Sequence, residues 1–325
     1  VSDIPGMQTV ISTHSPHIVA NHPFENIRYM STVTDQNGFQ NIKVKNFHEE
    51  LSEQYASEPE EFQFIKQYLS IESAELFFAD KAIFIEGISE QMLMHHFITQ
   101  FDNSKLLAEK KAMEQDPELK ASYIPLSAQN ITILQVGANS KAFRHFLDFL
   151  EIPSIIITDI DTVKAVQLNS KMVYKACSVS DFESCKTTNA SIEYYLGAPK
   201  YKQNDTDYKE WFDRMVSHDV ASVSPFIYIA YQKKENDYHA RSFEDAFINV
   251  NYNQIKIYKE SIKGLKRIEK ITKKRPKDIY CLTQDILNGK SDLASSFLFL
   301  AYAKNIKWKM PSYIEGGLEW LQAQK

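Results

Sequence analysis

Two short stretches decide the fold that this sequence predicts: Ala82–Glu90, AIFIEGISE, and Ser154–Asp161, SIIITDID. Each begins with apolar, largely β-branched residues and ends abruptly in carboxylates. This is the pattern of a buried parallel strand that presents functional residues at its carboxyl end. Gly87 allows the backbone to turn after Glu86, and Glu90 follows about one turn into the next helix. The sequence therefore predicts that both glutamates point into one crevice.

The second stretch adds Asp159 and Asp161, which lie two residues apart on an extended segment and so share one face. Carboxylates that converge in one site repel each other unless a cation neutralises them. Mg²⁺ and Mn²⁺ prefer such hard oxygen ligands. Together with Glu86 and Glu90, these residues predict a magnesium or manganese site. Each motif alone also suits a structural role, because acidic residues favour helix N-termini and solvated loops.

The composition, with 43% hydrophobic and 24% charged residues among 325, is that of an ordinary globular protein. A net charge of −5 argues against a basic surface overall, so DNA binding requires a local basic patch. Three cysteines without CxxC spacing suit a reducing cytoplasm, and the sequence contains neither a long apolar run nor an opening signal peptide. We therefore expect a cytoplasmic protein that does not span a membrane.

The N-terminal residues predict the end of one domain and a connector to the next. Gln8–Thr13 reads as a strand, with a helix beginning near Pro16, and Asn37-Gly38 predicts a hairpin turn. Apolar residues at helical spacing make residues 49–80 a helical connector. Because a buried-looking strand begins almost at once, we expect the chain to be the C-terminal part of a longer protein.

Residues 81–250 predict an α/β domain with a central parallel sheet flanked by helices. Ile131–Val136 and Phe226–Tyr231 are two further apolar strands, and helical segments separate all four strands. Residues 101–130 are polar and charged, which predicts a helical insertion. Ligands of such sheets bind beyond the carboxyl ends of the strands.

Residues 251–325 predict a helical C-terminal region with a basic helix over Tyr252–Lys277. This segment contains ten lysines and arginines but only two glutamates. It is either a solvated face or a DNA-backbone contact. The candidate DNA-binding residues are Lys263, Lys266, Arg267 and Lys270. Lys290 stands at a helix start, where a cation is disfavoured, and such a departure from a local rule indicates function.

The order of these motifs resembles the C-terminal half of OLD-family (overcoming lysogenization defect) ATP-dependent endonucleases. The matching strings are ISTHSPHIVA, SAELFFADKAIFIEG with Glu90, ITDID, KTTNAS, ARSFEDAF and the late Lys290. The resemblance implies a Toprim nuclease domain over 81–250, preceded by the tail of an ABC-type ATPase domain over 1–48. It also implies that His14 is the switch histidine that reaches the γ-phosphate of the nucleotide. Since the sequence contains no GxxxxGK[ST] phosphate loop, we expect ATP to be a cofactor only of the full-length protein.

The resemblance also implies roles for the site residues. Glu86 and Glu90 would bind one metal ion, with Asp159 and Asp161 serving it or a second. Glu244 would be a further ligand, and Lys290 and Arg241 would stabilise the charge on the scissile phosphate. The implied reaction is two-metal hydrolysis of a phosphodiester. Some relatives place an acidic residue where this chain has Gln135-Val136-Gly137, which leaves the ligand set of a second ion open.

The partners implied by the resemblance are DNA and further copies of the chain, as a homodimer or a higher homo-oligomer. Relatives act in anti-phage defence, and Gabija-type systems pair one with a UvrD-like helicase. The alternative function is a non-catalytic DNA-binding or assembly module with a structural metal site. Lys290 distinguishes the nuclease from the non-catalytic module, because a structural metal site needs no lysine beside its metal ions. Within catalysis, the nearest rivals are strand passage and primer synthesis. None of the 17 tyrosines is marked by its context as a topoisomerase nucleophile, and the sequence contains no zinc-binding cluster of the kind expected in a primase.

Overall fold

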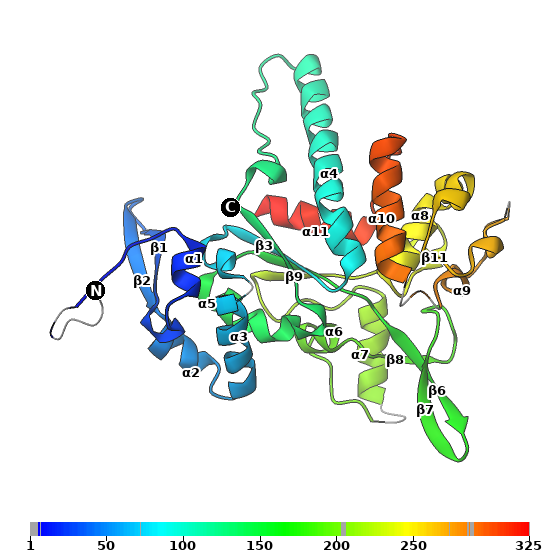
Figure 1. Cartoon of the computed structure of the whole chain (residues 1–325), viewed down its shortest axis with the longest axis horizontal. Helices are drawn as coiled ribbons and strands as arrows, with labels where there is room; N and C mark the ends of the chain where they lie inside the picture. Colours follow the sequence, from blue (N-terminus) through cyan, green and yellow to red (C-terminus); the bar gives the residue numbers. More distant parts are fainter. Residues whose placement is uncertain are drawn as a thin grey trace. The chain divides into compact units, whose positions relative to one another are not determined.

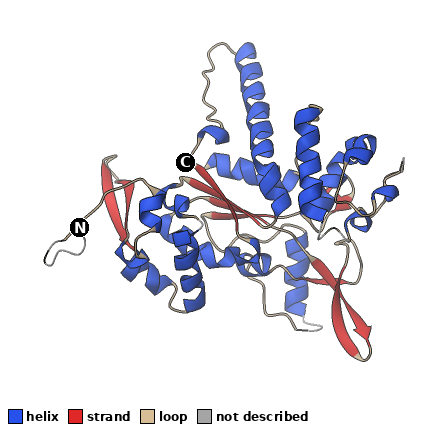
Figure 2. Cartoon of the chain, in the orientation of Figure 1, coloured by secondary structure: helices blue, strands red, loops and turns tan. Residues whose placement is uncertain are grey.

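A computed structural model describes residues 6, 8–71, 73–202, 206–272, 274–284, 286 and 289–324. The chain divides into two compact units, Val1–Asp80 and Lys81–Lys325. The second unit contains both helices and strands (Figure 2).

The first unit consists of one β-hairpin and several short helices. Its elements are α1 (Pro16–Ala20), η1 (Phe24–Asn26), β1 (Arg28–Thr34), β2 (Gln40–Asn46), η2 (Phe47–Leu51), α2 (Ser52–Gln54), α3 (Pro59–Ile71) and η3 (Ala74–Phe78). The predicted hairpin is confirmed, because β1 and β2 pair antiparallel around the Asn37-Gly38 turn. Gly38 has a φ of 83°, and Asp35 Oδ1 accepts the N–H groups of Asn37 and Phe39, each at 2.9 Å.

The strand predicted over Gln8–Thr13 is wrong, because residues 8–15 have no regular structure. No strand among the described residues pairs with this segment, and Val10 and Ile11 are 85% and 56% exposed. An apolar run forms a strand only where a neighbouring strand satisfies its backbone groups. The helix at Pro16 begins as predicted.

The second unit is built around a four-stranded parallel sheet in the order β4-β3-β5-β9. The strands are β3 (Lys81–Ile85), β4 (Ile131–Gln135), β5 (Ser154–Ile157) and β9 (Ile227–Ala230). Each lies on one of the four predicted strand segments, so the predicted α/β class is confirmed. In the register of the sheet, Ile85 lies beside Ile157, which brings the residues after β3 and β5 to one edge.

Helices cover both faces of this sheet (Figure 1). The helices of this unit are α4 (Ile88–Gln115), η4 (Leu126–Ala128), η5 (Gly137–Phe143), α5 (Arg144–Leu150), α6 (Ala190–Tyr195), α7 (Thr206–Val216), α8 (Phe243–Tyr258), η6 (Lys259–Ser261), η7 (Ile268–Lys270), α9 (Tyr280–Thr283), α10 (Lys290–Ala303) and α11 (Ser312–Ala323). Ile83 and Ile85 of β3 pack into the core formed with α4, α8, α10 and α11. Phe84 points to the other face, where its ring centroid lies 4.9 Å from that of Phe143. This alternation buries both faces of β3, which explains its continuous apolar sequence.

A three-stranded antiparallel sheet follows directly after the DxD motif, and the sequence reasoning did not anticipate it. Its strands are β6 (Thr162–Leu168), β7 (Lys171–Ala176) and β8 (Ser184–Thr187), in the order β7-β6-β8. We call this sheet the arm, because it extends away from the helices around the parallel sheet (Figure 1). A small separate hairpin pairs β10 (Lys234–Glu235) with β11 (Tyr238–His239).

The helical insertion predicted over 101–130 needs correction. The helix that begins at Ile88 continues without a break to Gln115, and an irregular return follows it. Asp102 of α4 fixes this return. Its carboxylate accepts the hydroxyl of Tyr123 at 2.6 Å and the N–H groups of Leu126 and Ser127 at 2.8 and 3.0 Å.

Replacing Asp102 with asparagine is expected to lower the free energy of unfolding by about 1–3 kcal/mol, because asparagine keeps one acceptor oxygen but presents its NH₂ group where the second carboxylate oxygen accepts a hydrogen bond. Burial opposes the charge of Asp102, but hydrogen bonds from Ser127, Tyr123 and Leu126 outweigh it and lower its pKa. The stabilisation is therefore fully present above the ordinary pKa of 3.8 and is lost as the pH falls through the lowered value. Urea unfolding of both proteins near neutral pH and again below pH 3.8 measures this. Asp116→Asn, at an exposed position of the same return, is the matched control.

The basic helix predicted over Tyr252–Lys277 is also wrong in extent. Helix α8 ends at Tyr258, and two isolated 3₁₀ turns separated by irregular chain follow. Gly264 has a φ of 82°, outside the right-handed helical region. Two of the apolar residues that suggested a helical stripe are buried in the core from this irregular path. They are Ile262 and Leu265, while Ile255 lies in α8 and Ile268 is partly buried against the core.

Among the described residues, no helix is both long enough and apolar enough to cross a membrane.

Candidate active site

The carboxyl ends of β3 and β5 place Glu86 next to the backbone of the second acidic motif. Glu86 Oε2 accepts hydrogen bonds from Thr158 Oγ1 at 2.5 Å, Asp159 N at 3.2 Å and Asn189 Nδ2 at 3.0 Å. Because three donors reach one oxygen, the carboxylate has a fixed orientation and its other oxygen, Oε1, makes none of these bonds. The two stretches that predicted a shared acidic site therefore do meet.

Asp159 is 5% exposed and is held by two donors. Gln232 Nε2 donates to Asp159 Oδ1 at 2.7 Å, and the N–H of Phe243 donates to the same oxygen at 2.8 Å. Phe243 opens α8, so its N–H is one of the groups that have no partner within the helix. Both bonds reach Oδ1, which leaves Oδ2 as the atom able to bind a cation.

Glu90 and Glu244 are each 1% exposed, and both lie near Lys290. Lys290 Nζ lies 3.2 Å from Glu244 Oε2, and Ser89 Oγ donates to Glu244 Oε1 at 2.9 Å. Glu90 Oε2 is buried with no hydrogen-bond partner. A Cβ on Gly87 would stand 2.8 Å from that oxygen, so a larger residue at this position would displace the Glu90 carboxylate.

Lys290 is the first residue of α10, as the sequence predicted. It follows Gly289, whose Cβ position would lie 2.1 Å from the backbone oxygen of Gly264. Only glycine permits this contact, which holds the start of α10 against the irregular basic segment. The cation at the disfavoured helix end is stabilised by the acidic residues it faces.

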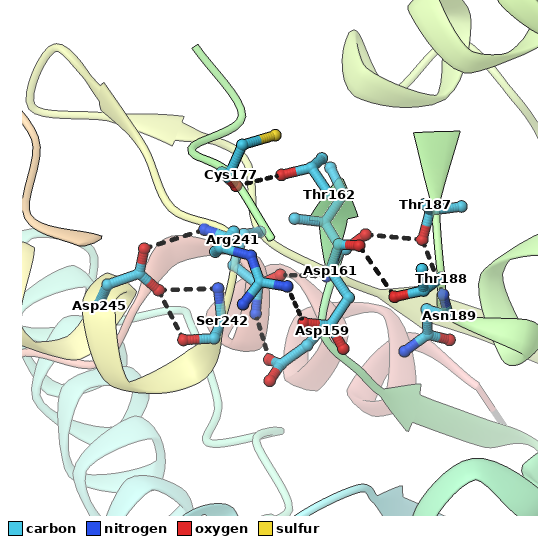
Figure 3. Close-up of polar contacts among 12 residues, drawn as sticks. Asp159, Asp161, Thr162, Cys177, Thr187, Thr188, Asn189, Arg241, Ser242 and Asp245 are labelled. Carbon is cyan, nitrogen blue, oxygen red and sulfur yellow. Dashed lines mark hydrogen bonds and ion pairs between the residues drawn. The ribbon is translucent and has the colours of Figure 1, made fainter. Parts of the chain in front are cut away.

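Asp161 forms an ion pair with Arg241, which Figure 3 shows. Arg241 Nη2 lies 2.6 Å from Asp161 Oδ1, and the N–H of Asp161 donates to Arg241 O at 3.1 Å. The guanidinium also lies over the Tyr280 ring, 5.2 Å from its centroid. Asp245 fixes the backbone on the other side by accepting the N–H groups of Arg241 and Ser242. In this arrangement Asp161 and Arg241 neutralise each other.

Among the described residues, the site contains more acidic than basic side chains, because Glu86, Glu90, Asp159, Asp161 and Glu244 face Lys290 and Arg241. The result is a strong tendency of Glu90, Asp159 and Asp161 to hold protons.

Burial and the charge of Glu244 raise the pKa of Glu90 to about 8. Burial, together with the charges of Glu90 and Glu86, raises the pKa of Asp159 well above its usual range. Burial also raises the pKa of Asp161, although Arg241 opposes this effect. Burial opposes the charge of Lys290, but Glu244 and Asp159 outweigh it and raise its pKa. A bound cation would relieve this excess of negative charge.

The donor set fits a hard divalent cation. It offers carboxylate oxygens only, and Glu90 Oε2 is buried without a hydrogen-bond partner. Across the described part of the chain, however, no three His, Cys, Asp or Glu side chains are already arranged to hold an ion. The carboxylates are therefore neighbours that need small side-chain movements to act as one ligand set.

The other predicted site residues lie elsewhere. His14 is exposed in the first unit, and its ring centroid lies 6.1 Å from that of Phe78. Its ATPase role stays a prediction. Of the basic candidates, Lys263, Lys266 and Lys270 are exposed, whereas Arg267 donates to Gln284 Oε1 at 2.7 Å.

Sequence reasoning missed three residues that orient the carboxylates: Thr158, Asn189 and Gln232. Asn189 caps α6, because its Oδ1 accepts the N–H groups of Ser191 and Ile192. Its Nδ2 group additionally holds Glu86. Gln232 lies just beyond the end of β9, and its Oε1 accepts the N–H of Ile160 at 2.8 Å. Its place after a strand of the same sheet was the signal that could have identified it.

Comparison with known proteins agrees with this geometry. Residues 77–161 match the family described as "Overcoming lysogenization defect protein-like, TOPRIM domain". Residues 77–161 therefore form a Toprim domain of the OLD-like family. The chain is also 31% identical over 336 residues to Endonuclease GajA of Bacillus cereus (strain HuB5-5). That alignment covers 97% of this chain but 42% of the relative, so the chain spans less than half the length of that protein.

Proposed function

We propose that this chain is the Toprim part of a divalent-metal-dependent DNA endonuclease. The observation that carries the proposal is the buried cluster at the carboxyl ends of β3 and β5, where Glu86 and Asp159 meet beside Glu90, Glu244 and Lys290. The likeness to an endonuclease over nearly the whole chain supports the same reading.

In the proposed reaction, Mg²⁺ or Mn²⁺ would activate the attacking water and stabilise the leaving oxygen of the phosphodiester. Glu86, Glu90, Asp159 and Glu244 would hold the ions. The oriented Oδ2 of Asp159 and the unpartnered Oε2 of Glu90 are the atoms best suited to this. Lys290 would stabilise negative charge that builds on the scissile phosphate. We propose that Arg241 contacts the same phosphate and that Asp161 orients the Arg241 guanidinium, because these two side chains already form an ion pair.

We further propose a role in anti-phage defence or DNA processing within a longer ATPase-Toprim protein, for which ATP is a cofactor. A homo-oligomeric state and a UvrD-like helicase partner belong to the same proposal. The likeness to Endonuclease GajA is what supports these points.

Incubation of the 325-residue chain with supercoiled plasmid and Mg²⁺ or Mn²⁺ tests the proposal. Nicked or linear products are expected, and EDTA is expected to abolish them, because four carboxylates without a cation leave the phosphate unbound. Added Mn²⁺ in excess of the EDTA should restore cleavage.

Two results would count against the proposal. Cleavage that persists in EDTA would show that the reaction does not depend on a divalent metal ion. Absence of cleavage by folded chain, both alone and within the full-length protein, would favour the alternative of a DNA-binding or assembly module with a structural ion.

A further inference from the structure

The two faces of the arm carry different chemistry. In the β6–β7 register Lys164 pairs with Lys175, whereas Ala165 pairs with Tyr174. Since directly opposed residues share a face and successive residues alternate, Lys164 and Lys175 lie on one face and Tyr174 lies on the other. On the first face, the ammonium of Lys164 is neutralised by Asp181 at 2.9 Å and Glu183 at 2.8 Å.

The second face combines a lysine with aromatic rings. Lys186 of β8 pairs with Val163, which places it on the same face as Tyr174. Its Nζ lies 4.9 Å from the ring centroid of Tyr174 and 4.7 Å from that of Tyr201. The two tyrosine hydroxyls are 3.1 Å apart. We call Met172, Tyr174, Lys186 and Tyr201 the aromatic face of the arm.

The aromatic face carries a positive charge that no acidic side chain of the described residues neutralises. Lys186 forms no ion pair with an acidic side chain of the described ranges. Tyr174 and Met172 are 41% and 46% exposed, so ring and thioether surface remain open to solvent beside the ammonium. Residues 162–202 contain six lysines and three acidic residues in a chain whose net charge is −5. A half-buried cation without an ion-pair partner among the described residues, beside exposed aromatic surface, favours a polyanion with flat, stacking groups.

The aromatic face is continuous with the candidate active site. After Lys186, Thr188 donates its hydroxyl to Asp161 O at 3.2 Å, and Asn189 donates to Glu86 Oε2 at 3.0 Å. Figure 3 shows Thr187, Thr188 and Asn189 on this path beside Asp161. An extended chain rises about 3.3 Å per residue, so Lys186 lies about 10 Å along the backbone from Asn189. If the scissile phosphate lies at the site of Glu86, the DNA strand would reach Lys186 within a few nucleotides.

We propose that the aromatic face of the arm binds a DNA strand as it leaves the site of cleavage. Lys186 contacts a backbone phosphate, and the exposed parts of Tyr174 and Met172 pack against a base. The inference rests on the proposed nuclease function and deepens it, since it assigns the surface that positions the substrate. The single strand is favoured over the duplex, because a paired base presents no ring face for stacking.

Fluorescence anisotropy of a labelled duplex with a single-stranded tail tests this, with Ca²⁺ in place of Mg²⁺ to hold back cleavage. Lys186→Gln and Tyr174→Leu are each expected to raise the Kd for the tailed DNA about tenfold, as loss of one phosphate contact or one stacked base implies. For Lys186→Gln, the slope of log Kd against the logarithm of the salt concentration should fall by roughly 0.7. Lys186→Arg keeps the charge and should retain the affinity.

Lys175→Gln is the matched control, because it removes the same charge from the other face of the same hairpin. It should change the Kd less than twofold. In cleavage assays with Mg²⁺, Lys186→Gln should raise KM far more than it lowers kcat. Thermal unfolding of each variant establishes that the arm is folded.

The outcomes are distinct. If the unaltered chain binds DNA but Lys186→Gln and Lys175→Gln weaken it equally, or neither does, the aromatic face is not the binding surface. If the substitutions raise the Kd for a blunt duplex as strongly as the Kd for the tailed DNA, the aromatic face does not bind a single strand. If the unaltered chain binds no DNA, the proposed function and this inference fail together.

Discussion

Replacing Glu86 with glutamine is expected to lower DNA cleavage by more than about a hundredfold while the chain stays folded. Removing a residue that hydrogen-bonds to a metal ligand typically lowers metal affinity or activity about 10- to 100-fold, so removing a direct ligand should lower activity more. Glutamine can still offer a carbonyl oxygen to Thr158, Asp159 N and Asn189, because all three donors reach one oxygen of the native carboxylate. The substitution therefore removes the charge and leaves the acceptor. Plasmid cleavage at several Mg²⁺ concentrations measures the effect.

The matched control for Glu86→Gln is Glu151→Gln, which removes one carboxylate charge from an exposed position at the end of α5. Its cleavage rate should equal that of the unaltered chain. If Glu86→Gln cleaves at the normal rate and needs no additional Mg²⁺, Glu86 is not a metal ligand.

Replacing Lys290 with methionine is expected to lower cleavage by about a hundred- to a thousandfold, the usual cost of removing one group that stabilises transition-state charge. Affinity for DNA should change little, because one half-buried cation contributes little to the contact with the phosphate backbone. The variant should also lose stability, by up to about 3–5 kcal/mol, since Glu244 would remain buried without its cation. Plasmid cleavage, anisotropy and urea unfolding measure these three effects.

A second substitution separates the catalytic role of Lys290 from its structural one. Glu244→Gln removes the buried charge that Lys290 neutralises, so the double variant Lys290→Met/Glu244→Gln should regain much of the lost stability. If Lys290 acts on the phosphate, the double variant cleaves far more slowly than Glu244→Gln alone. Equal rates for these two proteins would leave Lys290 with a purely electrostatic role in folding.

The sheet and the acidic motifs could be predicted because their signals are local. A β-branched run followed by Glu86-Gly87 indicates a buried strand and a turn from adjacent residues alone. The Asn37-Gly38 hairpin and the start of α10 at Lys290 are local in the same way. The basic segment after Tyr258 was misjudged, because its apolar spacing suits a helix, whereas its path depends on packing against the core.

The sequence by itself thus determined the class of the fold, the strands that carry the carboxylates, and the identity of Glu86, Glu90, Asp159 and Lys290 as candidates. Only the tertiary structure decided how these groups are held. Asn189 reaches Glu86 across 103 positions of the chain, and Gln232 reaches Asp159 across 73. The ion pair of Arg241 with Asp161 and the two faces of the arm likewise depend on pairing between distant segments. Periodicity and turn signals report the preferences of neighbouring residues, whereas these contacts exist only once the parallel sheet has brought its strand ends to one edge.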